Sequence, residues 1–197
     1  MNKPDRTPEL HRVNSRLTEF ETREENEQLH ISGYFAVFNS NYQIWNDMSE
    51  SIAPGAFADT LGEDIRALTN HDSTLVLGRN TAGTLELKED SHGLWGDILI
   101  NPKDTDAMNT YERVKRGDVN QCSFGFEILS EETEFRDDGS VHWTITAVRL
   151  HEVSVCTFPA YEETSIAARS AERDAAREAR SADAWKTKMK GVLSKWH

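Results

Sequence analysis

The chain has 197 residues, of which 37% are hydrophobic and 28% charged, and its formal net charge is −12. This size suits one folded domain with tails and excludes two full-sized domains. Its apolar runs are shorter than the roughly 20 residues of a membrane span, so no membrane partner is expected. The acidic excess argues against nucleic acid as the main partner, because phosphate binding needs a basic face.

The chain divides by composition into three parts. Residues 1–27 are polar without a sustained apolar period, which predicts an arm that is flexible or only partly helical. Residues 28–168 contain the alternating apolar segments of a folded domain. Residues 169–197 carry eight basic and four acidic residues, so their charge is +4 and residues 1–168 hold −16. An apolar stripe at helical spacing in this last part predicts a basic amphipathic helical tail.

The first half of the domain predicts short strands. Residues 31–37 form a β-rich run that is apolar on both faces, as in a buried strand. A Pro-Gly pair at positions 54–55 predicts a sharp turn before a short helix that ends near Gly62. Residues 65–68 predict a short strand with His71 at its end, and a turn at residues 89–93 predicts a β-hairpin.

The second half begins with a predicted helix over residues 104–115, with Asp104 as its N-terminal cap and Gly117 at its end. A strand that contains Ser123 follows directly. An Asp-Gly pair at positions 138–139 predicts a second hairpin, whose return strand is followed by a last one over residues 153–157. About eight strands with few helices indicate an α+β, mostly β fold, a mostly antiparallel barrel or sandwich.

Ser123 is the candidate nucleophile. In a strand, Cys122, Phe124 and Phe126 face one side, and Ser123 and Gly125 face the other. The first set suits a core and leaves Ser123 open, beside a glycine that lets another backbone approach. Acyl transfer needs such a hydroxyl together with an imidazole base, a group that orients the imidazole, and donors for the oxyanion.

Among seven histidines, His71 is the candidate base, because it follows a short apolar strand while most of the others have simple surface explanations. The third member is contested between His151 and Glu152. Alternation places His151 with the apolar Val153 and places Glu152 on the polar side, where a carboxylate could accept the second N–H of His71. Asp72 is a fallback, although adjacent residues on an extended chain point apart.

Cys122 is a rival nucleophile, which its apolar face disfavours because a buried thiol is inert. Cys122 and Cys156 lack a zinc-ligand spacing and are expected to be free thiols in a reducing cytoplasm. The N-terminus lacks the apolar stretch of a signal peptide, so a cytoplasmic location is expected. The absence of a metal-ligand cluster or phosphate loop in the sequence predicts that no cofactor is used.

An ordered set of motifs resembles the prohead serine proteases of tailed bacteriophages, which are related in fold to the herpesvirus assemblins. The resemblance spans residues 28–168 and rests on the segments ISGYFAVF at 31–38, ESIAPGAF at 50–57, NHD at 70–72, LG at 77–78, GL at 93–94, RG at 116–117, SFGF at 123–126, EVSV at 152–155 and PAY at 159–161. It implies an assemblin-like antiparallel β-barrel of about seven to eight strands flanked by a few helices, with a triad of Ser123, His71 and Glu152. Glu152 stands where the assemblins have a second histidine, and the assemblin Arg-Arg pair that serves the oxyanion has no clear counterpart.

The resemblance also implies a function, that of a serine endopeptidase of capsid maturation. It would act in the host cytoplasm inside the assembling prohead and cut scaffold, or the scaffold-like extension of the major capsid protein, and itself. The herpesvirus relatives suggest a homodimer, and the basic tail suggests docking on an acidic scaffold or shell. Two alternatives remain, a catalytically inactive protease-fold scaffold or capsid-assembly protein, and a cysteine hydrolase that uses Cys122.

Overall fold

The computed structural model describes residues 11–15, 20–25, 28–45 and 47–158, together with Asp174, Glu178 and Ala182. The chain divides into two units, Met1–Tyr161 and Glu162–His197, and the first contains the folded domain. Of the predicted tail, only Asp174, Glu178 and Ala182 are described, and each is helical. The remainder of that prediction lies outside the described residues. Within the described residues, no helix combines the length and apolar character needed to cross a bilayer.

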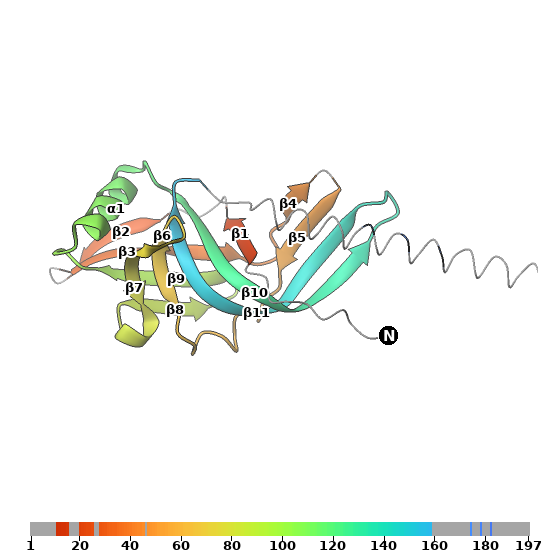
Figure 1. The fold of residues 1–197 in the computed structure, drawn as a ribbon, viewed down its shortest axis with the longest axis horizontal. Helices are drawn as coiled ribbons and strands as arrows, with labels where there is room; N and C mark the ends of the chain where they lie inside the picture. Colours follow the sequence, from red (N-terminus) through yellow and green to blue (C-terminus); the bar gives the residue numbers. More distant parts are fainter. Residues whose placement is uncertain are drawn as a thin grey trace, which may run out of the picture. The chain divides into compact units, whose positions relative to one another are not determined.

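The first unit is mostly β, as predicted (Figure 1). Among the described residues of this unit, the helices are one α-helix, α1 (Thr105–Arg116), and one short 3-10 helix, η1 (Asn80–Ala82). The strands are β1 (His11–Ser15), β2 (Glu21–Glu25), β3 (Gln28–Val37), β4 (Tyr42–Trp45), β5 (Met48–Ile52), β6 (Arg66–Thr69), β7 (Asp72–Arg79), β8 (Leu85–Glu89), β9 (Gly93–Ile100), β10 (Gln121–Phe135) and β11 (Val141–Cys156).

The strands form two sheets. One has seven strands in the order β1-β10-β11-β5-β4, with β6 paired to β11 and β7 paired to β6, and the other has the order β2-β3-β9-β8. The pairing of the described residues does not close either sheet on itself, so the predicted barrel is not confirmed. The antiparallel prediction was incomplete, because β11 runs parallel to both β5 and β6.

Two strands lie in the stretch that the sequence predicted as a flexible or partly helical arm. β1 pairs with β10, and β2 pairs with β3, both antiparallel. β2 reads Glu-Thr-Arg-Glu-Glu, which has no apolar face of its own to mark it as a strand. Its backbone hydrogen bonds to a neighbouring strand therefore supply the order that local propensity does not.

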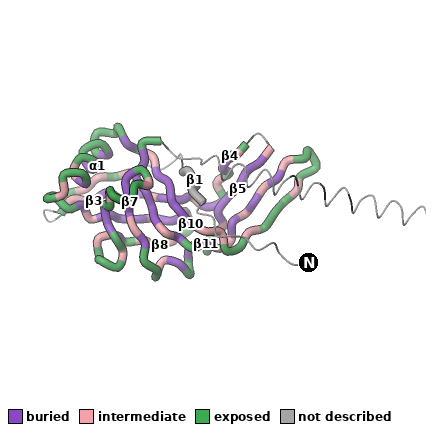
Figure 2. Tube along the Cα trace, in the orientation of Figure 1, coloured by how far each residue is buried: buried purple, intermediate pink, exposed green. Residues whose placement is uncertain are grey.

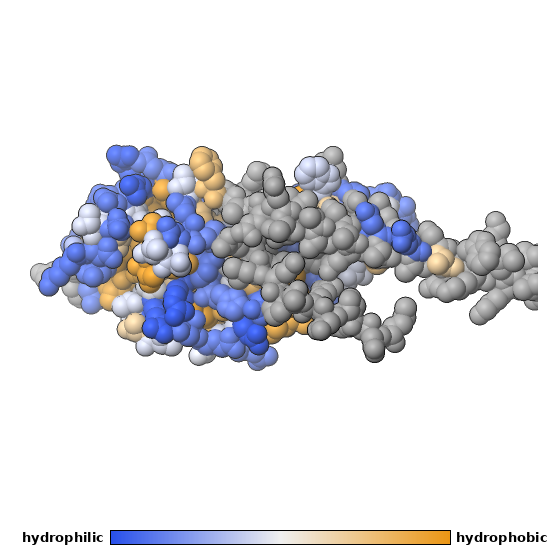
Figure 3. Space-filling view, in the orientation of Figure 1, coloured by the Kyte–Doolittle hydropathy of each residue, from blue (hydrophilic) through white to orange (hydrophobic). Residues whose placement is uncertain are grey.

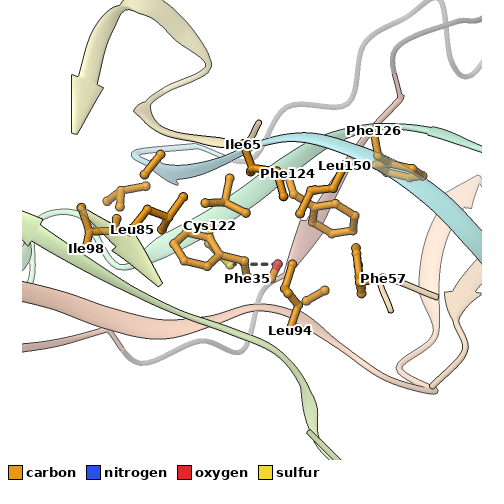
Figure 4. Close-up of a cluster of buried hydrophobic side chains, with 14 of the residues drawn as sticks. Phe35, Phe57, Ile65, Leu85, Leu94, Ile98, Cys122, Phe124, Phe126 and Leu150 are labelled. Carbon is orange, nitrogen blue, oxygen red and sulfur yellow. Dashed lines mark hydrogen bonds between the residues drawn. The ribbon is translucent and has the colours of Figure 1, made fainter. Parts of the chain in front are cut away.

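The main core contains the apolar face of β10, where Cys122, Phe124 and Phe126 are fully buried as alternation predicted (Figures 2 and 4). The rings of Phe124 and Phe126 stack with centroids 4.9 Å apart, and Phe57 meets Phe124 edge-on at 5.5 Å. Phe35 of β3, in the other sheet, belongs to the same cluster (Figure 4). The core thus joins the two sheets and fixes which face of β10 remains for polar residues.

The segment between β5 and β6 differs from the prediction, because residues 54–62 form successive turns in place of a short helix. Their backbone groups bond to other elements. The Val148 N–H donates to the Ala56 carbonyl at 3.0 Å, and the Phe57 N–H donates to Glu89 at 3.2 Å. These tertiary hydrogen bonds override the local helical tendency.

Helix α1 confirms the predicted helix and its caps. Asp104 accepts from the N–H groups of Asp106 and Ala107, and Gly117 ends the helix with φ 82°, in the left-handed region. The hydroxyl of Thr110 lies 3.1 Å from that of Thr69, at the end of β6. The helix therefore supports the hairpin that carries His71.

The two predicted hairpins are present, β8–β9 and β10–β11. The return strand of the second is longer than predicted, because β11 runs without interruption from Val141 to Cys156 where two strands were expected. Most of the coloured surface in Figure 3 is hydrophilic, and a hydrophobic patch lies in the region of β6 and β7. In that region Val76 of β7 is 42% exposed.

Candidate active site

His71 occupies a turn whose backbone conformation is unfavourable for a histidine. β6 and β7 pair through Thr69 and Asp72, so their loop is the two-residue pair Asn70-His71, with φ values of 52° and 59°. Two consecutive positive φ values define a type I′ turn, in which Asn followed by Gly is the favoured pair. Asparagine and histidine are enriched in this region among the residues other than glycine, although both carry some strain in it. Strain of this kind at a polar residue is typical of functional sites.

Three hydrogen bonds fasten this turn to β11 and to Thr157, the residue that follows it. The Asn70 N–H donates to the Val155 carbonyl at 2.9 Å, and the Asn70 side-chain oxygen accepts from the Thr157 N–H at 2.9 Å. The His71 N–H donates to the hydroxyl of Ser154 at 3.2 Å. The backbone that carries the imidazole is therefore fixed against the strand that carries Glu152.

The imidazole of His71 and the carboxylate of Glu152 meet at 2.6 Å, between Nδ1 and Oε1. The two side chains are only 7% and 10% exposed. An ionised carboxylate can only accept, so the shared hydrogen belongs to Nδ1 of the imidazole. In a neutral ring this leaves Nε2 with a lone pair. Nε2 is buried and has no hydrogen-bond partner in the described part of the chain.

Ser123 lies on the same face of the sheet as Glu152. In the antiparallel β10–β11 pair, Ser123 is opposite Ser154 and Gly125 is opposite Glu152. Opposite residues project to the same side with their Cβ atoms about 4.5–5.5 Å apart. Since Ser154 contacts the backbone of His71, all three predicted site residues belong to one face and its covering turn.

The predicted openness of Ser123 was wrong, because its exposed fraction is 0%. Ser154 opposite is also fully buried, and Glu152 is 8% exposed. Alternation assigns a side chain to a face of the sheet, but it carries no information on what lies over that face.

A β-bulge settles which of the two contested residues adjoins His71. The register shifts after Gly125, so that Glu152 opposes Gly125 while Leu150 opposes Phe126, and His151 is the extra residue. The His151 side chain is 40% exposed and lies 3.0 Å from Glu127. Bulges frequently re-aim side chains next to active sites. His151 is therefore neither on the core face, where alternation placed it, nor in contact with His71.

Gly125 provides the space for Glu152. A Cβ atom at this position would lie 2.5 Å from Oε1 and 3.2 Å from Cδ of Glu152. The sequence suggested that a backbone would approach this glycine, whereas the structure places the carboxylate side chain there. The glycine on the polar face of β10 correctly indicated a close approach at this position. The sequence did not reveal that the approaching group is the side chain of Glu152.

Ser154 is a polar contact of the site that was not predicted from the sequence. Its hydroxyl donates to Oε2 of Glu152 at 2.5 Å and accepts from the His71 N–H. Both oxygens of the carboxylate are therefore bonded, Oε1 by the imidazole and Oε2 by the hydroxyl. Strand alternation had placed Ser154 on the Glu152 face, which was the signal that could have identified it.

The alternative residues lie elsewhere. Asp72 is exposed and caps Thr74, whose hydroxyl bond lowers the pKa of this carboxyl. Cys122 lies in the core without a disulfide bond, and its Sγ donates to the carbonyls of Tyr34 and Phe35 at 3.3 and 3.5 Å. Cys156 is likewise a buried thiol outside any disulfide, as expected. Within the described residues, no group of three His, Cys, Asp or Glu side chains could hold a metal ion.

In this mostly β fold, a turn with a histidine covers a sheet face that holds a serine and a glutamate, and these are groups that serine peptidases use. The caudovirus prohead serine protease family matches residues 18–178, and the chain belongs to this family. The prohead protease of Enterobacteria phage HK97 is 31% identical over 142 residues, which are 70% of this chain and 59% of that protein. This chain thus spans less than two thirds of that relative.

A solved structure shares the fold. The capsid assembly protease of bacteriophage T4 superimposes with a TM-score of 0.50 over 78% of this chain and 100% of that one, at 9% sequence identity. At this identity the likeness concerns the arrangement of strands and helices alone.

Proposed function

We propose that this protein is a serine endopeptidase of prohead maturation, with Ser123, His71 and Glu152 as its catalytic residues. The observation that carries the proposal is the imidazole of His71. Its Nδ1 is held by Glu152 at 2.6 Å, and its Nε2 is buried and unbonded within the described residues. The turn that carries this ring is bonded to Ser154, the residue opposite Ser123. An unbonded basic nitrogen in a buried site costs free energy, which a role as general base explains.

The proposed reaction has two halves. Ser123 Oγ attacks the carbonyl carbon of the scissile peptide while its proton passes to Nε2 of His71, and Glu152 stabilises the imidazolium. The imidazolium gives that proton to the departing amine, which leaves an acyl-enzyme. A water molecule then loses a proton to Nε2 and attacks the ester, and the proton returns to Ser123.

The substrate is proposed from the family. A prohead protease among the relatives supports cleavage of scaffold, or of the scaffold-like extension of the major capsid protein, and of the enzyme itself. The reaction would take place inside the assembling prohead in the host cytoplasm. Ser123 is buried, so the residues over its face must move for a peptide or a probe to reach its hydroxyl. The same proposal includes three further expectations. They are a protease domain bounded by residues 28 and 168, an assemblin-like barrel, and a homodimer.

A fluorophosphonate probe tests the serine mechanism directly. The expected result is covalent labelling of the folded protein, lost in Ser123→Ala and greatly reduced in His71→Ala. Ser130→Ala is the matched control, because Ser130 is an exposed serine on the same strand and should leave labelling unchanged. Absence of labelling in a folded wild-type protein would instead favour an inactive protease-fold scaffold.

The substrate is tested separately by mass spectrometry. Wild-type enzyme incubated with its capsid precursor should release defined fragments of the precursor and of itself, and the Ser123→Ala variant should release neither. If the probe labels Ser123 but the precursor is not cleaved, the protein is a serine hydrolase and the proposed substrate is wrong.

A further inference from the structure

Ser154 joins the two ends of the His71–Glu152 pair. Its Oγ accepts from the His71 backbone N–H at 3.2 Å and donates to Glu152 Oε2 at 2.5 Å, while Glu152 Oε1 accepts from His71 Nδ1 at 2.6 Å. The three residues therefore form a closed ring of hydrogen bonds. Along the path from the His71 N–H through the Ser154 hydroxyl to Oε2, the first bond polarises the second and strengthens it.

We propose that Ser154 is a positioning residue for proton transfer, which holds the carboxylate and the imidazole in their reactive orientation. The inference rests on the proposed function, since it assigns a role within the same site. Ser154 does not act on the substrate here. It acts through Glu152 and His71.

The burial of Glu152 makes a second donor necessary. With 8% of the residue exposed, a carboxylate oxygen without a partner would carry the full cost of desolvation. His71 provides one donor for Oε1, and Ser154 provides one for Oε2. Hydrogen bonds to both oxygens thereby fix the plane of the carboxylate, which a single bond to the imidazole could not do.

The backbone of His71 needs the same hydroxyl. At φ 59° this residue is held in an unfavourable region, and its N–H points away from the normal hairpin ladder towards Ser154. The direction of the hydroxyl follows from this bond. Because Oγ accepts from the backbone N–H, its own hydrogen is directed to the carboxylate, in agreement with the short contact to Oε2.

Other charged groups near the pair are occupied elsewhere. Arg66 of β6 is the cross-strand neighbour of Glu152, and its guanidinium pairs with Asp64 at 3.1 Å. Asp72, next to His71 in sequence, is exposed and bonds to Thr74. The acidic limb of the pH–rate profile should therefore report proton binding by the His71–Glu152 pair.

The test compares Ser154→Ala with wild type on a peptide substrate. Loss of one hydrogen bond to a charged group should lower kcat about tenfold, with KM changed less than about twofold. The hydroxyl stabilises the anionic form of the pair, so without it the pair binds a proton at higher pH and the acidic limb moves upward. Ser154→Thr, which keeps the hydroxyl, should restore the limb.

Thr60→Ala is the matched control. Thr60 is also a buried hydroxyl bonded to a backbone N–H of β11, that of Leu150 at 2.9 Å, but within the described residues it makes no hydrogen bond to Glu152 or His71. Its loss should lower stability and leave the pH limb in place. If the acidic limb of the pH–rate profile lies at the same pH in wild type and in a folded Ser154→Ala variant, Ser154 does not have the proposed role.

A second measurement does not need activity. In the Ser123→Ala background, nitrogen-15 NMR follows the Nδ1–H signal of His71 with and without Ser154→Ala. The signal should shift and its titration should move to higher pH when the hydroxyl is absent. An unchanged signal rejects the inference, whereas an inactive wild type with a shifted signal rejects only the proposed function.

Discussion

Gly125 and Glu152 occupy the same small space on opposite strands. A methyl group added at Gly125 would lie 2.5 Å from Oε1 of Glu152, well inside van der Waals contact. Oε1 is also the atom that accepts from His71 at 2.6 Å, and Oε2 is held by Ser154. The carboxylate cannot move away from position 125 without breaking at least one of these bonds.

Gly125→Ala should therefore affect activity far more than stability. Displacement of a catalytic group by about 1 Å can cost about 100-fold in rate, whereas the side-chain shift itself should cost about 1 kcal/mol of stability. Steady-state cleavage kinetics and thermal unfolding check the two effects. Gly62→Ala serves as control, because no atom lies within 4 Å of a Cβ there. Full activity in a folded Gly125→Ala variant would contradict the assigned position of the carboxylate.

Glu152→Gln should preserve the shape of the site and remove its charge. An amide cannot stabilise the imidazolium as a carboxylate does, and it can present an N–H to Nδ1 and so favour the wrong tautomer. The expected loss in kcat is roughly 10²- to 10⁴-fold, by the logic of serine protease triads. Glu127→Gln is the control, because Glu127 bonds to His151 and Arg149 away from His71. If Glu152→Gln and Glu127→Gln have similar kcat values, Glu152 has no part in the mechanism.

Thiol reagents should leave the activity intact. Cys122 and Cys156 are both 0% exposed, and a thiol in apolar surroundings is inert. Cys122→Ala should lower the free energy of unfolding by about 1–2 kcal/mol, because it leaves a cavity in the core, and keep kcat within about twofold. Urea unfolding and cleavage assays on the folded variant measure these quantities. Inactivation by a thiol reagent that Cys122→Ala abolishes would favour the cysteine hydrolase.

The local parts of this site could be predicted from sequence because they depend on short-range rules. Alternation in β10 separated Cys122 from Ser123, and alternation in β11 placed Glu152 beside Ser154. The cap at Asp104 and the glycine at 117 defined α1 within one residue of its observed bounds. In each case the physical cause lies within a few residues of the chain.

The long-range parts could not be predicted. His71 reaches Glu152 because β6 runs parallel to β11, with Leu68 opposite Ser154, and a parallel pair leaves no turn signal in the sequence. The bulge that excludes His151 depends on the register between β10 and β11. The polar strand β2 is ordered by its partner β3 and not by its own pattern. All three depend on pairing energies between distant segments.

His142 should make stability depend on pH. Its ring lies between the hydroxyls of Ser49, 2.8 Å from Nδ1, and Ser51, 2.9 Å from Nε2. Burial lowers the pKa of His142 below its ordinary value of 6.5; the charge of Arg136 adds to this, and Glu134 opposes it. The folded state thus binds this proton less readily than the unfolded state.

The sign of the effect follows. Well above pH 6.5 both states are neutral at this residue and its contribution to folding is constant. As the pH falls below 6.5, the unfolded state takes up the proton first, and the folded state loses stability until its own lower pKa is passed. Wild type should therefore lose more unfolding free energy between pH 7.5 and pH 5 than His142→Gln does.

Urea unfolding at several pH values measures this difference. His142→Gln also loses a hydrogen bond, which lowers stability equally at every pH, so the slope and not the level carries the result. His92→Gln is the control, because His92 is exposed in the β8–β9 turn and should follow wild type. Parallel curves for wild type and His142→Gln would show that the ring between Ser49 and Ser51 binds its proton equally well in the folded and unfolded states.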